Sequence, residues 1–129
     1  MKEKISRYKS SVQARKQRKF RALAPLHLRR KMMSANLSKE LRKKYLKRSI
    51  PLIKGDSVRI MRGEFKNKKG KVLNVNKKKL KVYIEGIQRS KKDGTKINVP
   101  FDPSNLQIIE LNLEDKKRIQ ALERKGVRK

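Results

Sequence analysis

Almost every side chain in this sequence that could take part in chemistry is a cation. The 129 residues include 40 Lys or Arg and 11 Asp or Glu, which gives a formal net charge of +29. Such an excess makes a compact chain repel itself unless a polyanion neutralises the charge. Duplex nucleic acid carries roughly one charge per ~1.7 Å of axis and releases counterions when Lys and Arg bind. We therefore predict a nucleic acid as the partner.

The other reactive side chains do not form a pattern typical of an enzyme or a metal site. The single histidine, His27, lies near Arg29 and Arg30, and no neighbour is placed to orient it as a general base. A polar RNA contact or a plain surface position suits it better. Cysteine is absent, which excludes disulfides, thiolate zinc sites and cysteine nucleophiles. The acids are scattered, and metalloprotease, P-loop and dinucleotide-binding motifs are absent. We expect no catalysis, cofactor, metal or small-molecule substrate.

The charge is concentrated in the first part of the chain. Residues 1–54 hold 19 Lys or Arg against two acids and contain no glycine. Residues 55–112 hold 14 basic and six acidic residues together with five of the six glycines. Only 35% of the residues are hydrophobic, too few for the whole chain to bury itself in one core. We therefore predict one small domain with a basic arm that orders on its partner. No apolar run approaches the ~20 residues of a membrane span, so we expect no membrane insertion.

The arm is predicted to form short helices. Residues 10–20 lack Gly and Pro and are rich in helix formers. Pro25 suits the first position of a second helix that runs to Met33, and Ser38 suits the N-cap of a third that covers residues 39–47. At the other end, Asn112 is predicted to cap a helix that Gly126 terminates.

The middle of the chain has the alternation of β-strands. Val58 and Ile60 share one face of a strand over residues 57–61, and residues 80–84 alternate in the same way. Val72 and Val75 are three apart, which predicts a bulge at residues 73–74. Residues 97–99 are expected to pair with a strand near Ile87, and residues 106–111 form the last strand. Five short strands separated by turns indicate a small barrel.

The strongest motif is a basic loop between two of these strands. It lies within residues 54–72, where Gly63 and Gly70 bracket a run of lysines. The glycines let the backbone turn tightly and approach a phosphate closely. Lysines 66, 68, 69 and 71 place several ammonium groups in one area, and Arg59 and Arg62 add planar donors. Phe65 can either stack an unpaired base or close the end of the barrel.

This segment resembles the KOW motif, the strand–glycine loop–strand signature of SH3-like barrels in ribosomal and transcription-associated proteins. Its flanks resemble those of the eukaryotic and archaeal KOW protein of the large ribosomal subunit, above all in residues 34–45, 48–51 and 102–105. Two positions depart from that family. Asn67 replaces a usual glycine, and Asn tolerates the left-handed conformation. Asp102 replaces a common histidine, and its carboxylate repels phosphate.

The resemblance implies a mostly-β fold with flanking helices. Its centre is a small SH3-like barrel at residues 50–112, with a hairpin insertion near residues 86–99. A basic N-terminal extension covers residues 1–49, and a C-terminal helix with a basic tail covers residues 113–129. The implied function is that of a structural constituent of the large ribosomal subunit, which binds large-subunit rRNA and neighbouring ribosomal proteins, acts early in subunit assembly and lies near the polypeptide exit. The implied location is the cytoplasmic ribosome, with a nucleolar stage in a eukaryote.

Phosphate contacts should supply most of the affinity of such a protein. The residues predicted to bind rRNA are the basic side chains of the arm, loop and hairpin together with one aromatic residue: Arg15, Lys16, Arg18, Lys19, Arg21, Arg29, Arg30, Lys31, Arg42, Lys43, Arg48, Arg59, Arg62, Phe65, Lys66, Lys68, Lys69, Lys71, Lys91 and Lys92. The predicted turn residues are Gly55, Gly63, Gly70 and Gly94.

Two other functions fit part of the sequence. A KOW-type transcription elongation factor has the same loop, but such modules usually accompany another domain. A chromatin-like DNA-compacting protein explains the basic arm but leaves the glycine-bracketed loop unexplained.

Overall fold

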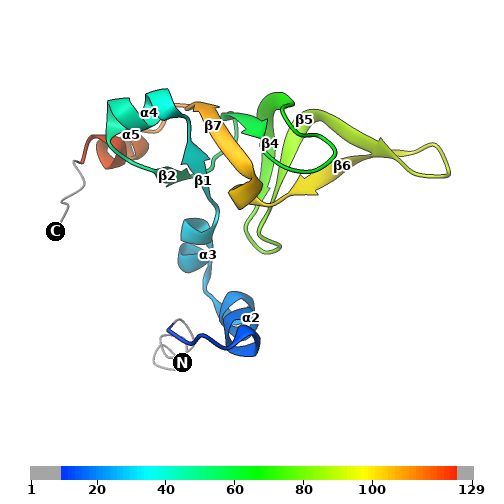
Figure 1. Cartoon of the computed structure of the whole chain (residues 1–129), viewed down its shortest axis with the longest axis horizontal. Coiled ribbons are helices and arrows are strands. Elements are labelled where there is room, and N and C mark those ends of the chain that lie inside the picture. The colour runs from blue at the N-terminus through cyan, green and yellow to red at the C-terminus, as the bar shows by residue number, and fades with distance from the viewer. Residues whose placement is uncertain (1–9, 125–129) are drawn as a thin grey trace.

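The computed structural model describes residues 10–124, and its centre is a seven-stranded sheet, with two helices toward one end of it and two more below it in the view of Figure 1. In chain order the elements are α2 (Ala14–Leu23), α3 (Leu26–Met32), β1 (Ser34–Leu37), α4 (Lys39–Tyr45), β2 (Ser49–Pro51), β3 (Ser57–Ile60), β4 (Lys69–Asn76), β5 (Lys81–Ser90), β6 (Lys96–Phe101), the 3-10 helix η1 (Pro103–Asn105), β7 (Leu106–Glu110) and α5 (Lys116–Glu123).

The strands run across the sheet in the order β2-β1-β7-β3-β4-β5-β6. All neighbouring pairs with a given register are antiparallel except β1 and β7, which are parallel. The mostly-β fold with flanking helices is confirmed. Among residues 10–124 the edge strands β2 and β6 do not pair with each other, so hydrogen bonds do not close the predicted barrel.

The core forms where the alternating strands place their apolar residues on one side. Val58 and Ile60 of β3, Val82 and Ile84 of β5, and Leu106 and Ile108 of β7 are all completely buried. The bulge predicted in β4 is confirmed, because the register against β5 shifts between Val72 and Asn74. A second shift, between Tyr83 and Gln88, surrounds Gly86 with its φ of +74°. Strand β5 therefore continues through this irregularity and includes the residues near Ile87 that were predicted to pair with residues 97–99.

Two strands were missed by the sequence analysis, and both lie near the arm. Strand β1 sits between β2 and β7 and places Ala35 and Leu37 in the core, although its residues fall within the predicted basic extension. Met33, Ala35 and Leu37 alternate with polar residues, a period-2 signal that was available in the sequence. The β1–β2 pair is short, and α4 connects its strands.

The predicted helices are present with shifted ends. Helix α2 begins and ends a few residues later than predicted, and Pro25 is the N-cap residue of α3 rather than its first residue. The Ser38 hydroxyl accepts from the Leu41 amide as predicted, but α4 ends at Tyr45 because Leu46 is left-handed (φ 53°). The prediction for α5 was wrong at its start: the Asp115 carboxylate is the cap. The predicted terminator Gly126 lies outside the described residues.

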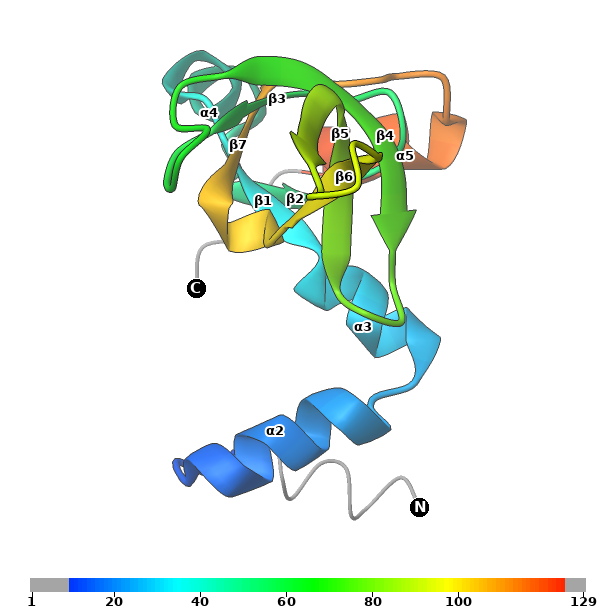
Figure 2. The same ribbon diagram turned by 90° about the vertical axis from the view of Figure 1, so that its right-hand side faces the viewer.

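Helices α2 and α3 form the described part of the basic arm before β1. They extend away from the sheet, with α3 next to the β4–β5 turn and α2 beyond α3 (Figure 2). The Arg29 guanidinium donates to the carbonyls of Ala22 and Ala24 at 2.6 and 2.8 Å and to that of Lys78 at 2.8 Å. One side chain thus ties the α2–α3 linker to the turn between two core strands.

Candidate nucleic-acid interface

The basic loop between β3 and β4 has a defined backbone. The Asn67 amide donates to the Ile60 carbonyl at 2.8 Å, and the Ile60 amide donates to the Lys68 carbonyl at 3.0 Å. Within the loop, the Lys66 amide donates to the Gly63 carbonyl at 3.1 Å. Asn67 has a φ of +69°, so the left-handed conformation expected at this departure from the family is confirmed. The lysine side chains therefore project from a fixed platform.

The four glycines predicted for turns fall into two groups. Gly55, Gly63 and Gly94 have φ values of +89°, +88° and +83°, as expected of turn positions. Gly70 lies inside β4 and has no positive φ, so the prediction of a turn there was wrong. A Cβ on Gly70 would lie 2.6 Å from Ile84 Cγ2 and 3.0 Å from the Glu85 carbonyl oxygen. Glycine is needed here because β5 approaches closely.

Phe65 is half-buried and packs against the core. Its ring meets that of Phe101 edge-to-face with centroids 6.1 Å apart, and the Lys68 ammonium lies 5.1 Å from its centroid. Of the two roles considered for Phe65, closing the end of the fold is the one these contacts favour. On the ring face that Lys68 covers, base stacking would have to displace that side chain.

Most of the predicted binding residues are accessible. Sixteen of the twenty are exposed, and the partly buried ones are Arg29, Arg42, Arg59 and Phe65. Each of these four has a partner inside the protein. Arg29 holds the arm to the β4–β5 turn, and Arg42 donates from Nε to the Leu37 carbonyl at 2.9 Å. We therefore assign Arg29 and Arg42 a structural role, because each donates to backbone carbonyls of the protein itself.

Arg59 is held at the edge of a small hollow. Its Nη2 donates to Gln107 Oε1 at 2.6 Å, and Arg59 lies opposite Lys69 in the β3–β4 register. With Lys39 at the start of α4 they line a hollow of about 250 Å³, which Glu40 also borders. The structure thus brings Arg59 and Lys69 together from two strands, and it adds Lys39, which the sequence analysis did not single out.

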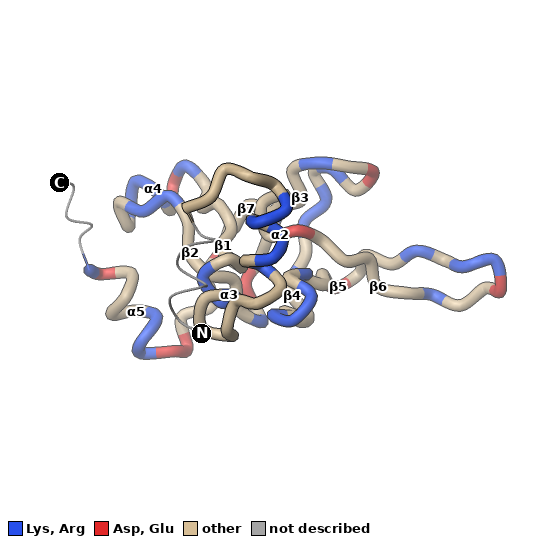
Figure 3. The backbone as a smooth tube through the Cα atoms, turned by 90° about the horizontal axis from the view of Figure 1, so that it is seen from below, with Lys and Arg blue, Asp and Glu red and all other residues tan. Residues whose placement is uncertain are grey.

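The basic residues are spread over the molecule rather than gathered at one point. Lys and Arg follow α2, α3, the β4–β5 turn, the β3–β4 loop and the far tip of the β5–β6 hairpin (Figure 3). The hairpin extends from one end of the sheet, and α4 and α5 lie toward the other (Figure 1). Lys91 and Lys92 are therefore remote from the arm. The exposed turn lysines 77, 78 and 79 join the arm's basic surface through Arg29 and were missing from the predicted set.

The hairpin tip is organised by Asp93. Its carboxylate accepts from the Thr95 hydroxyl at 2.7 Å and from the Thr95 amide at 3.0 Å. These hydrogen bonds, the side-chain one first, lower the pKa of Asp93 below its usual 3.8. The Lys91 amide donates to the Thr95 carbonyl at 2.9 Å, which closes the turn and presents Lys91 and Lys92 at its end.

A buried ion pair joins the sheet to α5, and the sequence analysis missed it. The Arg118 guanidinium donates to both carboxylate oxygens of Asp56, at 2.6 and 2.8 Å, with side-chain exposures of 4% and 0%. Asp56 also accepts from the amides of Ile53 and Asn112 at 3.0 and 2.9 Å. The only hint in the sequence was an acid directly after Gly55 in a basic segment.

Within residues 10–124 no cluster of His, Asp and Glu is arranged to hold a metal ion. In the same range no helix has both the length and the apolar character needed to span a bilayer. His27 is exposed at the beginning of α3, on the rim of a 380 Å³ hollow that Arg30, Lys31 and Lys117 also line.

Comparison with known proteins shows which family this chain resembles. The family model of the ribosomal proteins called L26 in eukaryotes, together with their archaeal counterparts, matches residues 11–125. Among similar proteins, one named large ribosomal subunit protein uL24 in Korarchaeum cryptofilum (strain OPF8) is 48% identical over 113 residues, or 88% of this chain and 86% of the relative. Another of the same name, in Methanosphaera stadtmanae, is 47% identical over 115 residues, or 89% of this chain and 98% of the relative.

Proposed function

The chain belongs to the ribosomal protein family that comprises eukaryotic L26 and its archaeal counterparts, and we propose that its exposed basic surfaces hold several segments of large-subunit rRNA together. Its uL24 relatives identify it as a structural constituent of the large ribosomal subunit, with a ribosomal, cytoplasmic location. The family is not one of enzymes. The comparisons support neither a transcription elongation factor nor a chromatin-like protein.

The observation that carries the proposal is the rigid basic loop between β3 and β4. Lysines 66, 68, 69 and 71 and Arg62 are exposed on a backbone that internal hydrogen bonds fix. A backbone that is already fixed loses little freedom on binding, and each phosphate that these side chains neutralise releases counterions. The arm and the hairpin tip add further groups of basic residues at other places on the molecule (Figure 3). A molecule with separate basic points suits a site where several RNA segments meet.

The resemblance to the KOW protein of the large subunit underlies the finer parts of the proposal. We propose that the protein joins the large subunit early in assembly, lies near the polypeptide exit and contacts neighbouring ribosomal proteins. Early binding fits a protein whose phosphate contacts fix the mutual positions of RNA segments. In a eukaryotic cell this step would place the chain in the nucleolus.

A salt titration on a loop variant that lacks three positive charges tests the binding surface. Lys66, Lys68 and Lys69 are changed to Gln together, and the control changes Lys116, Lys117 and Arg124 at α5 to Gln, which removes the same charge elsewhere. The parent should lose roughly 10³–10⁵ in affinity for large-subunit rRNA between 50 and 200 mM salt if it makes about 6–10 phosphate contacts. The loop variant should bind more weakly, and its salt slope should fall by about one for each phosphate that it no longer neutralises.

The same variants separate binding from folding. Reduced like-charge repulsion raises the melting temperature and removal of the Lys68–Phe65 interaction lowers it, so we expect little net change. A loop variant that binds rRNA as the parent does would mean that these lysines only face solvent. A parent with a flat salt response would contradict the electrostatic basis of the proposal.

A further inference from the structure

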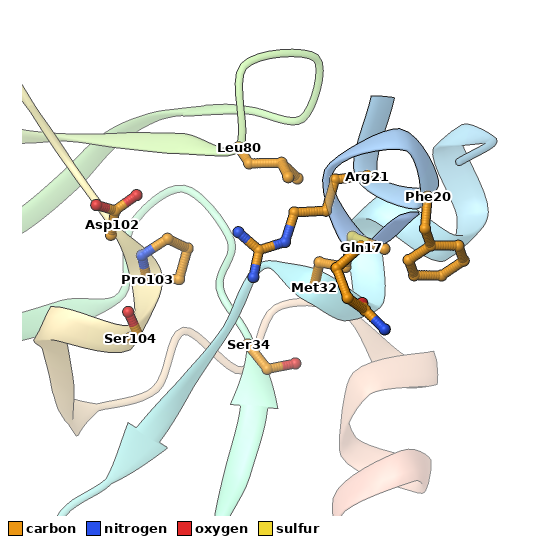
Figure 4. Close-up of a pocket in the computed structure, with 9 residues that line it drawn as sticks. All are labelled: Gln17, Phe20, Arg21, Met32, Ser34, Leu80, Asp102, Pro103 and Ser104. Carbon is orange, nitrogen blue, oxygen red and sulfur yellow. The ribbon is translucent and has the colours of Figure 1, made fainter. Parts of the chain in front are cut away.

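One hollow on this molecule combines apolar walls with both signs of charge. It has a volume of about 420 Å³, within the ~300–1,000 Å³ usual for ligand sites, and lies between α2 and the end of the sheet. Phe20, Met32, Leu80 and Pro103 supply apolar surface, and Arg21, Asp102 and Ser104 supply polar groups (Figure 4). The elements that meet here are far apart in the sequence.

The cation in this hollow is available to a ligand. The Arg21 side chain reaches from α2 toward Pro103 and Ser104 (Figure 4). No hydrogen bond or ion pair within residues 10–124 engages its guanidinium, in contrast to Arg29, Arg42 and Arg59. A guanidinium is planar, offers two parallel donors and stacks on aromatic rings.

The anion in this hollow is the Asp102 carboxylate, and only one of its two oxygens has a partner among residues 10–124. Lys81 Nζ lies 2.7 Å from Asp102 Oδ1, and the two side chains are 36% and 50% exposed. Within the described part of the chain, Asp102 Oδ2 has no donor. An acid is unexpected on a protein of net charge +29 that binds a polyanion, because it repels phosphate. It suits a ligand that offers hydrogen-bond donors.

We infer that this hollow accepts one unstacked guanine base of the rRNA, an inference that rests on the proposed function. Guanine has the donors N1–H and N2–H₂ on its Watson–Crick edge, which match a carboxylate. Its O6 and N7 form an acceptor pair that matches Arg bidentately. Bases of single-stranded RNA are read on these edges and stack on apolar or guanidinium planes. Asp102 takes the donor edge, Arg21 the acceptor edge, and Leu80 and Pro103 pack on the ring.

A phosphate suits the hollow less well, because Asp102 opposes it and the apolar wall would gain nothing. Adenine, cytosine and uracil each lack the combination of two adjacent donors and a separate acceptor pair. The hollow thus adds base selectivity to a surface that otherwise holds RNA by its phosphates.

Binding of short RNA strands tests the inference directly. The probes are uridine strands of about 12 nucleotides, within the ~4–16 nucleotide range of single-strand sites. Each carries one central G, A or C, or none, and anisotropy is measured at one fixed salt concentration. The parent should bind the G strand about tenfold more tightly than the others. Asp102→Asn should abolish this preference. The control Glu85→Gln, which removes an exposed acid on β5 outside the hollow, should keep it.

The outcomes separate the base site from the proposed function. RNA binding without a guanine preference in the parent, or a preference that survives Asp102→Asn, overturns the base site alone. Absence of all RNA binding overturns the proposed function as well. A photoreactive side chain at Ser104, in a chain assembled into large subunits, should crosslink to rRNA at a guanosine. Crosslinking to a ribosomal protein instead would overturn the base site, because a protein side chain would then fill the hollow.

Discussion

At the residue scale the fold depends on a charge pair rather than on the basic surface. Asp56 is completely buried and accepts hydrogen bonds from the Arg118 guanidinium and from two backbone amides. Asp56→Asn leaves a buried guanidinium without its counter-charge, and such losses cost about 3–5 kcal/mol. We expect chemical denaturation to show a drop of that size. The control Glu110→Gln, at an exposed acid that accepts from Ser57, should stay within ~0.5 kcal/mol of the parent.

An unchanged stability for Asp56→Asn would mean that α5 packs on the sheet without needing the pair. If α5 detached while the core stayed folded, the Asp56–Arg118 ion pair would hold α5 to the sheet without stabilising the core.

The close approach at Gly70 gives a second residue-scale prediction. Gly70→Val places its Cβ against the backbone at Glu85, which cannot move without disturbing the β4–β5 ladder. We expect a loss of more than ~1 kcal/mol in the free energy of unfolding. The neighbouring Lys71→Val, at an exposed position, should be close to neutral in a melting experiment. Equal stability of the two variants would contradict the close approach.

Asp93 predicts a local dependence on pH at the hairpin tip. Its pKa in the folded protein lies below 3.8, so its contribution to the turn is complete above that value and is lost as pH falls through the folded pKa. A carboxyl NMR titration should find the lowered pKa, and Thr95→Val should move it upward because the hydroxyl bond is removed. A titration that Thr95→Val leaves unaltered would refute the assignment.

At the scale of elements, the arm and the sheet differ in how firmly they are held. Helix α2 buries only Phe20, and Arg29 anchors the linker that follows it. Strand β3 lies between two neighbouring strands. Hydrogen exchange should therefore be fast in α2 and slow in β3, and rRNA should slow it in α2, since ordering free segments costs roughly 1–2 kcal/mol per residue. Equal protection of α2 with and without RNA would show that the arm is ordered independently of its partner.

The elements that the sequence predicted well are those with a local signal. Ser38 capped α4, and the three-residue spacing of Val72 and Val75 located the bulge in β4. Strand β1 was missed although Met33, Ala35 and Leu37 alternate with polar residues, whereas β2 has only three residues and is a strand through its pairing with β1. Asp115 was passed over as a cap because several polar residues precede α5. Of these elements, only β2 depends on a partner distant in the sequence.

The candidate site was predictable in composition more than in geometry. The exposed loop lysines follow from charge and glycine spacing alone. The sequence does not show which arginines bind inside the protein and which remain exposed. Arg29, Arg42 and Arg59 meet their hydrogen-bond partners only in the folded chain. The hollow beside Asp102 joins α2 to the end of the sheet, a proximity that no local pattern contains.

At the scale of the whole molecule, the chain is a small sheet with groups of basic residues at several separate places on it. Its net charge of +29 is compatible with a compact state chiefly when RNA surrounds it. The uL24 relatives place it in the large ribosomal subunit, and the fixed loop, the arm and the hairpin are the parts that would meet rRNA.

Sedimentation through high-salt sucrose gradients tests this account most directly. A tagged chain expressed in cells should migrate with the large subunit in stoichiometric amounts and remain there at salt concentrations that remove loosely bound basic proteins, because many phosphate contacts act together. Its presence at the top of the gradient, or with the small subunit, polymerase or chromatin, would contradict the account.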